Sequence, residues 1–260
     1  MDILRAENLC ISFGGLAAVK NVSFTIPQNK IISLIGPNGA GKTTIFNIIT
    51  GFSQADSGTV ELCGEVINHI SPERRIALGM ARTFQNVRLF RQMTVLENVM
   101  IGNRRHIHYN VAGGLLHTKK WKQGEETSKA ACCEILERIG LLDEKDELCS
   151  NLPYGKQKKL EIARALASQP MLLLLDEPAA GLNPQETQDL SAFIRALPSE
   201  SLSVLLIEHD MSMVMNISDY IYVVNQGEQL AEGLPEHVKS NQDVIDAYIG
   251  RGGIRKLAES

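Results

Sequence analysis

The sequence predicts an α/β fold with a parallel sheet at its centre, an antiparallel β region near the N-terminus and a helical subdomain inserted into the middle of the chain. The parallel sheet follows from buried apolar runs that alternate with helical patterns. These runs cover residues 31–35, 171–175 and 203–207. Over about residues 86–160 the apolar residues instead recur at helical spacing. We therefore expect one domain over 1–250, with this helical subdomain inside it, and a tail over 251–260.

The N-terminal segment shows the alternation of apolar and polar residues that is typical of antiparallel strands. Apolar residues such as Ile3 and Val22 stand among polar residues and turn signals. Residues 59–62 and 65–67 continue the pattern around Gly64. We expect short antiparallel strands on both sides of the first buried run.

Turn and cap signals define the elements of the C-terminal half. Asn183, Pro184 and Glu186 suit the N-cap, the first position and the capping-box position of a helix. Residues 220–224 and 229–231 are separated by a turn and predict a hairpin. The C-terminal part of the α/β core is therefore expected to end in an antiparallel pair.

Composition indicates an ordinary folded protein, with 44% hydrophobic residues, 22% charged residues and a net charge of −4. This charge does not favour nucleic acid as a partner. No apolar run approaches the roughly 20 residues that cross a bilayer, and the five cysteines lack disulfide or zinc spacing. We expect a cytosolic chain that reaches a membrane only through other subunits. A basic stretch within 103–128 predicts a solvated face, with a partner or lipid-headgroup contact as the alternative: Arg104, Arg105, His106, His108, His117, Lys119, Lys120 and Lys122.

A glycine-rich turn after the first buried run carries the pattern G-x-x-x-x-G-K-[ST] and leads into an apolar helix. In such a phosphate loop, backbone N–H groups face the phosphates, the helix dipole favours their charge, and the lysine reaches the β- and γ-phosphate oxygens. The hydroxyl after the lysine suits Mg²⁺, which makes Thr43 a predicted metal ligand. We predict that ATP with Mg²⁺ binds at Gly36, Pro37, Asn38, Gly39, Ala40, Gly41, Lys42, Thr43 and Thr44.

Two carboxylates stand at the end of the second buried run, where α/β sheets bind ligands. Asp176 is suited to the Mg²⁺ shell, and Glu177 is suited to polarise the attacking water. His209 follows the third run and could reach the γ-phosphate from the far edge of the same crevice. Taken alone, a strand end with solvated acids explains Asp176 and Glu177 equally well, and His209 would more often be an ordinary strand-end histidine. Their occurrence after a phosphate loop favours a nucleotide site.

Together these motifs resemble the nucleotide-binding subunits of ABC transporters, over nearly the whole chain and in the expected order. The resemblance implies a P-loop NTPase fold, with a RecA-like core, an antiparallel β subdomain and an inserted α-helical subdomain. Residues 36–43 match the Walker A loop, 172–176 the Walker B strand, 152–157 (LPYGKQ) the signature motif and 180–183 the D-loop. The resemblance further assigns adenine stacking to Phe13, nucleotide contacts of the signature motif to Tyr154 and Gly155, metal binding and catalysis to Gln85, the catalytic role to Glu177 and the switch role to His209.

Longer segments, among them RTFQNVRLF, MTVLENVMIG, LDEPAAGLNP and ISDYIYVVNQG, resemble the ATPase subunits of high-affinity branched-chain amino acid importers. The resemblance implies an ATP-hydrolysing motor that pairs with a second cassette, either a copy or a paralogue. It also implies transmembrane permease subunits, an indirect link to a solute-binding protein, and attachment to the cytoplasmic face of the membrane. Two alternatives stay open: transport of an amide, urea or lipopolysaccharide, and a soluble regulatory cassette without a membrane partner.

Two motifs depart from the family pattern. The signature is usually L-S-G-G-Q, whereas Pro153 stands here in place of serine and Tyr154 in place of the first glycine. Proline offers neither an N–H nor a hydroxyl to the opposite γ-phosphate. Asn183 replaces the usual D-loop aspartate and carries no charge. We expect weaker engagement of the opposite ATP, while the Walker residues of this chain are intact.

Overall fold

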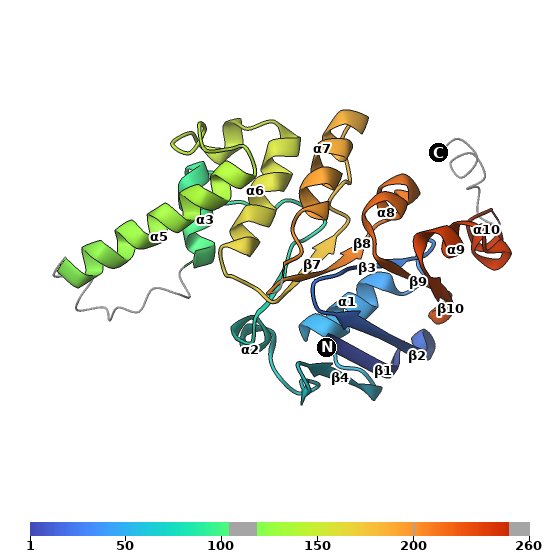
Figure 1. Ribbon diagram of the computed structural model, residues 1–260. Coiled ribbons are helices and arrows are strands. Elements are labelled where there is room, and N and C mark those ends of the chain that lie inside the picture. The colour runs from blue at the N-terminus through green and yellow to red at the C-terminus, as the bar shows by residue number, and fades with distance from the viewer. Residues whose placement is uncertain (104–118, 200, 250–260) are drawn as a thin grey trace. The chain divides into compact units, whose positions relative to one another are not determined.

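The computed structural model describes residues 1–103, 119–199 and 201–249, which form two compact units (Figure 1). The first unit comprises Met1–Arg82 and the chain from Met171 onward, and the second comprises Thr83–Pro170. Two sequence predictions, the basic stretch from Arg104 to His117 and the tail over 251–260, lie outside the described residues.

A six-stranded sheet forms the centre of the first unit, in the order β10-β9-β3-β8-β7-β6. All neighbouring strands pair in parallel except β9 and β10, which are antiparallel. Strands β3, β7 and β8 are buried along their whole length. The predicted parallel sheet is therefore confirmed. The strands are β3 (Ile31–Ile35), β6 (Met80–Arg82), β7 (Leu172–Asp176), β8 (Ser203–Ile207), β9 (Tyr220–Asn225) and β10 (Glu228–Gly233).

An antiparallel sheet in the order β2-β1-β4-β5 forms the second layer of the first unit. Its strands are β1 (Asp2–Phe13), β2 (Leu16–Pro27), β4 (Ser57–Leu62) and β5 (Glu65–Val66). The expectation of short strands was wrong for β1 and β2, which run for 12 residues each. Asn8 and Asn21 adopt positive φ values of 51° and 55°, and the pairing register shifts near both. These irregularities break the alternation that marks a single long strand.

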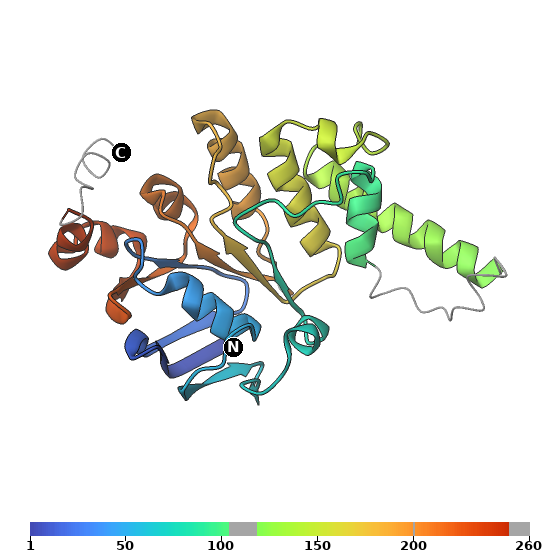
Figure 2. The same ribbon diagram turned by 180° about the vertical axis from the view of Figure 1, so that it is seen from behind.

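Helix α1 (Lys42–Thr50) lies between the two sheets in Figures 1 and 2. Its buried residues Ile45, Phe46 and Ile49 belong to one core with apolar residues of both sheets. The other helices of this unit are α2 (Pro72–Ala77), α7 (Pro184–Arg195), α8 (Met211–Ile217), α9 (Pro235–Lys239) and α10 (Gln242–Ile249). The core therefore fixes the helix that follows the phosphate loop.

The predicted start of α7 is confirmed by its capping box. The Asn183 side chain accepts the backbone N–H of Glu186 at 2.9 Å, and Glu186 accepts the N–H of Asn183 at 3.0 Å. Pro184 occupies the first helical position. These two bonds satisfy backbone donors that a helix N-terminus otherwise leaves unpaired.

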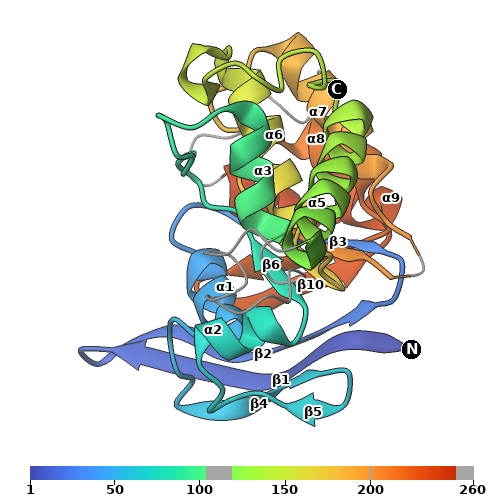
Figure 3. The same ribbon diagram turned by 90° about the vertical axis from the view of Figure 1, so that its left-hand side faces the viewer.

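Three helices pack together in the second unit (Figure 3): α3 (Val95–Asn103), α5 (Lys119–Arg138) and α6 (Tyr154–Leu166). This unit also has a 3₁₀ turn, η2 (Cys149–Asn151). Helices α3 and α6 approach so closely that a Cβ at Gly102 would lie 2.0 Å from the carbonyl oxygen of Arg164. Across the part of the chain that the structure describes, each helix is too short or too polar to span a bilayer.

Candidate functional site

The phosphate loop, residues 36–43, connects β3 to α1 in a conformation that two glycines make possible. Gly36 has a φ of 154°, and a Cβ there would lie 2.0 Å from the carbonyl oxygen of Val224. Gly41 has a φ of 103°, and its Cβ would lie 2.6 Å from the carbonyl oxygen of Ala18. L-residues with side chains rarely adopt such φ values. The glycines are therefore needed for close packing against neighbouring backbone.

Backbone hydrogen bonds hold the loop in place. The N–H of Ala40 donates to the carbonyl oxygen of Pro37 at 3.1 Å, and the carbonyl oxygen of Ala40 accepts from Gly227, in the turn between β9 and β10, at 3.0 Å. Asn38 and Gly39 at the loop tip are exposed, as is Thr43, whereas Thr44 is half-buried. The loop thus presents its tip and the first turn of α1 to solvent.

Lys42 is buried with 6% exposure, and its ammonium donates to the carbonyl oxygens of Gly36 at 2.6 Å and Pro37 at 3.0 Å. Burial lowers the pKa of Lys42, while the negative charges of Glu177 and Asp176 act in the opposite direction. The structure therefore brings the predicted lysine into the field of both predicted carboxylates.

Asp176 ends β7 as a buried carboxylate, paired with an arginine that the sequence analysis did not select. Arg82 Nη2 lies 2.8 Å from Asp176 Oδ2, and the two side chains are 10% and 8% exposed. Arg82 Nη1 also donates to Asn47 at 2.8 Å and to Thr50 at 3.1 Å, both on α1. The guanidinium lies over the Phe46 ring, 5.5 Å from its centroid. Arg82 thus ties the end of β7 to the helix that follows the phosphate loop.

Glu177 and His209 face each other at the ends of neighbouring strands. His209 Nδ1 lies 3.4 Å from Glu177 Oε1, with the histidine 48% and the glutamate 16% exposed. Glu177 adopts a φ of 48°, which is uncommon outside glycine, and its N–H donates to the carbonyl oxygen of Ile207 at 2.9 Å. This strained backbone is held by the adjacent strand β8.

The remaining predicted site residues are distributed between the units. Phe13, in the first unit, ends β1 and is 54% exposed. Gln85, Tyr154 and Gly155 belong to the second unit. There the carbonyl oxygen of Gln85 accepts the Lys158 ammonium at 2.8 Å, and Tyr154 begins α6 directly after Pro153. Their contacts with a nucleotide stay predictions.

The oxygen donors of Asp176 and Thr43, two of the predicted metal ligands, are chemically better suited to Mg²⁺ than to a transition metal. Asp176 and Thr43 offer the hard oxygen ligands that Mg²⁺ prefers. Residues 1–103, 119–199 and 201–249 hold no group of three or more His, Cys, Asp or Glu side chains that could bind a metal ion. Mg²⁺ is usually held by one or two carboxylates together with substrate phosphates, so the donor set suits a metal that arrives with a nucleotide.

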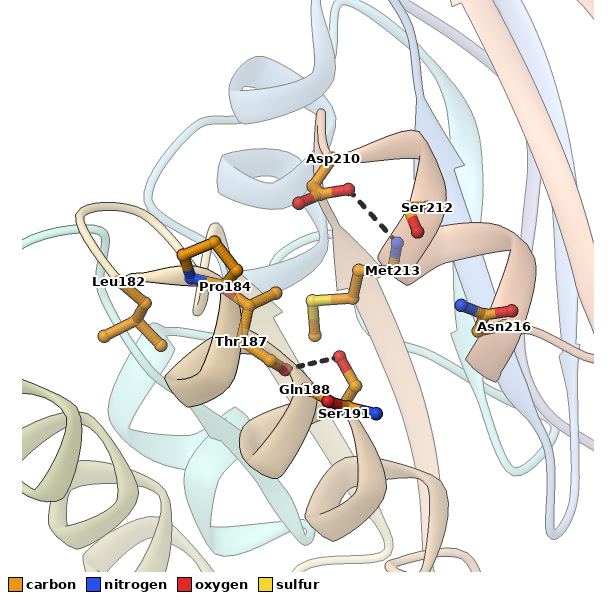
Figure 4. Close-up of a pocket in the computed structure, with 9 residues that line it drawn as sticks. All are labelled: Leu182, Pro184, Thr187, Gln188, Ser191, Asp210, Ser212, Met213 and Asn216. Carbon is orange, nitrogen blue, oxygen red and sulfur yellow. Dashed lines mark hydrogen bonds between the residues drawn. The ribbon is translucent and has the colours of Figure 1, made fainter. Parts of the chain in front are cut away.

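A pocket of about 420 Å³ lies elsewhere in the first unit, between α7 and α8 (Figure 4). It contains none of the residues predicted to bind the nucleotide. Among the described residues that line it, only Asp210 is charged, and its carboxylate caps α8 by accepting the N–H of Met213 at 3.2 Å. The lining residues are Leu182, Pro184, Thr187, Gln188, Ser191, Asp210, Ser212, Met213 and Asn216.

Comparison with known families decides which group of proteins combines these features. The model of the ABC transporter family matches residues 19–180, which include the phosphate loop and the end of β7. The chain belongs to the ABC transporter family. A second model, of the branched-chain amino acid ATP-binding cassette transporter, matches residues 228–254. The family that the sequence motifs predicted is confirmed.

Several relatives of this ABC family chain match over almost its whole length. It is 47% identical to the high-affinity branched-chain amino acid transport ATP-binding protein BraF of Pseudomonas aeruginosa and to its counterpart LivG of Escherichia coli. Both alignments cover 95% of this chain and 98% of the relative. The crystal structure of MJ1267 in its ADP conformation, an ATP-binding cassette of an ABC transporter, is 35% identical. It aligns with a TM-score of 0.84 over 96% of this chain and 99% of that chain, so the predicted P-loop fold is confirmed.

Proposed function

We propose that the chain is the ATP-hydrolysing motor subunit of an ABC importer for branched-chain amino acids. The observation that carries the proposal is the convergence of Lys42, the carboxylates of Asp176 and Glu177, and His209 at the carboxyl ends of β3, β7 and β8 in one unit. Ligands of parallel α/β sheets bind at this edge. The names of the relatives BraF and LivG support the substrate class.

Binding of the nucleotide is assigned to the phosphate loop. The backbone N–H groups of residues 36–44 and the Lys42 ammonium bind the phosphates, and Phe13 stacks on the adenine. Thr43, Asp176 and Gln85 would hold Mg²⁺, which supplies charge neutralisation at the β- and γ-phosphate oxygens. Lys42 must exchange its bonds to the loop carbonyls for bonds to phosphate, and its buried position favours an anionic partner.

Hydrolysis is assigned to Glu177. Its carboxylate polarises the attacking water and accepts its proton, while Gln85 helps to position the reacting groups. His209 lies beside that carboxylate and donates a hydrogen bond to the γ-phosphate. Glu177 adopts a positive φ directly after β7, and its N–H bond to the carbonyl oxygen of Ile207 holds this backbone conformation.

The working assembly contains a second cassette and membrane partners. Tyr154 and Gly155 at the start of α6 contact the ATP of the opposite cassette, where Pro153 weakens the contact and makes a paralogous partner attractive. Transmembrane permease subunits hold the chain at the cytoplasmic face, and a solute-binding protein delivers the amino acid to them. Residues 1–250 act as one ATPase domain, with the second unit as its helical subdomain.

Reconstitution tests this proposal directly. The chain is combined with candidate cassette, permease and solute-binding subunits in proteoliposomes, and Mg-ATP hydrolysis and uptake of leucine and urea are measured. The expected result is hydrolysis that rises with the membrane subunits and is coupled to leucine uptake. Glu177→Gln should abolish both, while the exposed Glu228→Gln leaves both intact.

Three results would contradict parts of the proposal. Hydrolysis that no membrane subunit changes would favour a soluble regulatory cassette. Uptake of urea without leucine would identify another transport system. Wild-type rates in Glu177→Gln would remove Glu177 as the base.

A further inference from the structure

Glu208 is a buried acidic residue beside the proposed catalytic pair, and the chemistry above does not use it. It lies between β8 and His209 and is 1% exposed. Burial raises the pKa of its carboxyl group, and hydrogen bonds from backbone N–H groups oppose that rise. Burying an ionisable group lowers the stability of the fold unless hydrogen bonds compensate for the lost hydration. The hydrogen bonds of Glu208 are therefore important for its position.

The two carboxylate oxygens of Glu208 bind two different loops. Oε1 accepts the N–H of Ala179 at 2.8 Å, in the turn that follows Glu177. Oε2 accepts the N–H of His209 at 3.1 Å. One side chain therefore joins the backbone next to the proposed base to the backbone of the proposed phosphate-binding histidine.

Neighbouring bonds prevent these two loops from adjusting independently. Glu177 is bound through its N–H to Ile207, the residue before Glu208. The N–H of Ala180 donates to the carbonyl oxygen of Glu177 at 3.2 Å, which closes the turn. On the other side, Asp210 caps α8, as the dashed line between Asp210 and Met213 in Figure 4 shows. A shift of either loop relative to the other therefore stretches a bond of the Glu208 carboxylate.

We propose that Glu208 is a positioning residue for hydrolysis, whose carboxylate fixes the distance between the turn that carries Glu177 and the backbone of His209. The inference rests on the proposed function, because it assumes that Glu177 and His209 act on ATP. Misplacement of reacting groups by about 1 Å can lower a rate about 100-fold, so a bond that fixes this geometry affects turnover.

Replacing the Glu208 carboxylate by an amide or by a shorter carboxylate tests whether its two hydrogen bonds are needed. A carboxylate accepts at both oxygens, whereas an amide of the same shape has one acceptor and one donor. In Glu208→Gln one of the two bonds is lost, and an NH₂ group faces a backbone N–H in a buried site. Glu208→Asp keeps the charge but is one methylene shorter, so it reaches the two loops less well.

Asp219→Asn provides a matched control. The Asp219 carboxylate also accepts a backbone N–H, that of Ile31 at 2.8 Å. It lies at the start of β3, at the opposite end of that strand from the phosphate loop. Asparagine keeps one acceptor oxygen for the Ile31 N–H, so this variant removes the carboxylate charge and its ion pairs with Lys30 and Arg195, each at 3.4 Å, without touching the proposed site. It therefore reports the effect of losing a bonded carboxylate away from the site.

The experiment measures kcat and KM for ATP in the full chain reconstituted with its membrane subunits. Glu208→Gln should lower kcat about tenfold or more while KM changes less than about twofold. Glu208→Asp should lie between Glu208→Gln and wild type, and Asp219→Asn should keep kcat within about twofold of wild type. An unchanged kcat in Glu208→Gln, or an equal loss in Asp219→Asn, would overturn the inference. If Glu208→Gln does not fold, Glu208→Asp decides: a lowered kcat supports the inference, and a wild-type kcat overturns it.

Amide hydrogen exchange separates this inference from the proposed function, since it needs no hydrolysis. In Glu208→Gln, exchange should be faster than in wild type at the amide that loses its acceptor, either Ala179 or His209, and in Asp219→Asn it should be unchanged at both. Absence of hydrolysis in the wild type would contradict the proposed function alone. Wild-type hydrolysis with unchanged exchange at both amides in Glu208→Gln would contradict the Glu208 bridge alone.

Discussion

The phosphate loop and the carboxylate side of the candidate site, residues 176–177 and 208–209, are held by different kinds of interaction. Backbone contacts hold the loop, where Gly36 allows main chain to approach main chain and Ala40 pairs with the β9–β10 turn. On the carboxylate side, two charged side chains, the largely buried Arg82 and the fully buried Glu208, bind the strand ends and the turns that follow. The difference shows that one site can combine a geometry set by glycine with a geometry set by buried charge.

The two kinds of support respond differently to mutation. A glycine contact fails sterically when a side chain is added, which affects folding and binding together. Replacing a buried charged side chain leaves its hydrogen-bond partners unpaired. This can displace a functional group while the protein still folds. Substitutions of the two kinds should therefore differ, and the glycine contact should give the largest effect.

Gly36→Ala should be the most damaging change on the loop side. Its Cβ would lie 2.0 Å from a backbone oxygen, so the chain must shift, at a cost of about 3 kcal/mol or more in the free energy of unfolding. The matched control is Gly39→Ala, where the φ is +80° but no atom lies within 4 Å, and the expected cost is about 1–2 kcal/mol. Urea unfolding and ATP affinity measure both. Equal losses would show that the φ, not the contact, constrains the loop.

Arg75→Met should lower stability without changing the site. Arg75 is buried and donates to five backbone carbonyls, among them Ile48 and Ile49 at the end of α1 at 2.6 Å. Carbonyls left unpaired should lower the free energy of unfolding by about 3 kcal/mol. ATP affinity of the folded variant should stay within about twofold. A tenfold loss of affinity would show that α1 transmits strain to the loop.

Arg82→Met should change ligand binding more than stability, whereas Arg75→Met should change stability more than ligand binding. The reason is that Arg82 contacts a proposed metal ligand. Loss of its bond to Asp176 should weaken Mg²⁺ affinity of the ATP complex about tenfold, as second-shell changes typically do. Titration of Mg²⁺ against ATP binding measures this, with Mg-free ATP binding as the internal control. Tighter Mg²⁺ binding would identify Arg82 as a competing cation rather than a positioning residue.

Lys20→Ala should have the smallest effect and tests whether side-chain charge supports the loop. Lys20 pairs with Glu228 at 3.0 Å in an exposed position, while its backbone N–H donates to Gly227 at 2.7 Å. Alanine keeps the backbone bond, so the free energy of unfolding should change by less than about 1 kcal/mol. ATP affinity should be unchanged. A clear loss of affinity would mean that surface charge also holds the loop side.

The sequence predicted the loop, the buried strands and the two strand-end carboxylates because each depends on residues close together in the chain. It failed at β1 and β2, where Asn8 and Asn21 introduce irregularities. The buried residues Leu4 and Ala6 are followed by Leu9 and Ile11, so the alternation changes phase at Asn8. A period-2 pattern that shifts by one residue looks like two short strands.

The roles of Arg82 and Glu208 could not be predicted from the sequence, for a different reason. Arg82 ends a strand of only three residues, β6, and its partner Asp176 is 94 residues away. Glu208 and Ala179 are 29 residues apart. Charged residues at strand ends are usually solvated, and only the pairing of β6, β7 and β8 places these two among buried partners.

The phosphate loop and the strand-end positions of the proposed catalytic residues could be predicted from the linear sequence, since they follow from glycine sterics and from apolar runs with short periods. The family followed from the resemblance of these motifs to ABC transporter cassettes. Only the tertiary structure decided which buried charges hold those residues. Such pairs form between strands that are neighbours in the sheet but distant in the chain. Their stability depends on burial, which cannot be predicted from the residues next to them in the sequence.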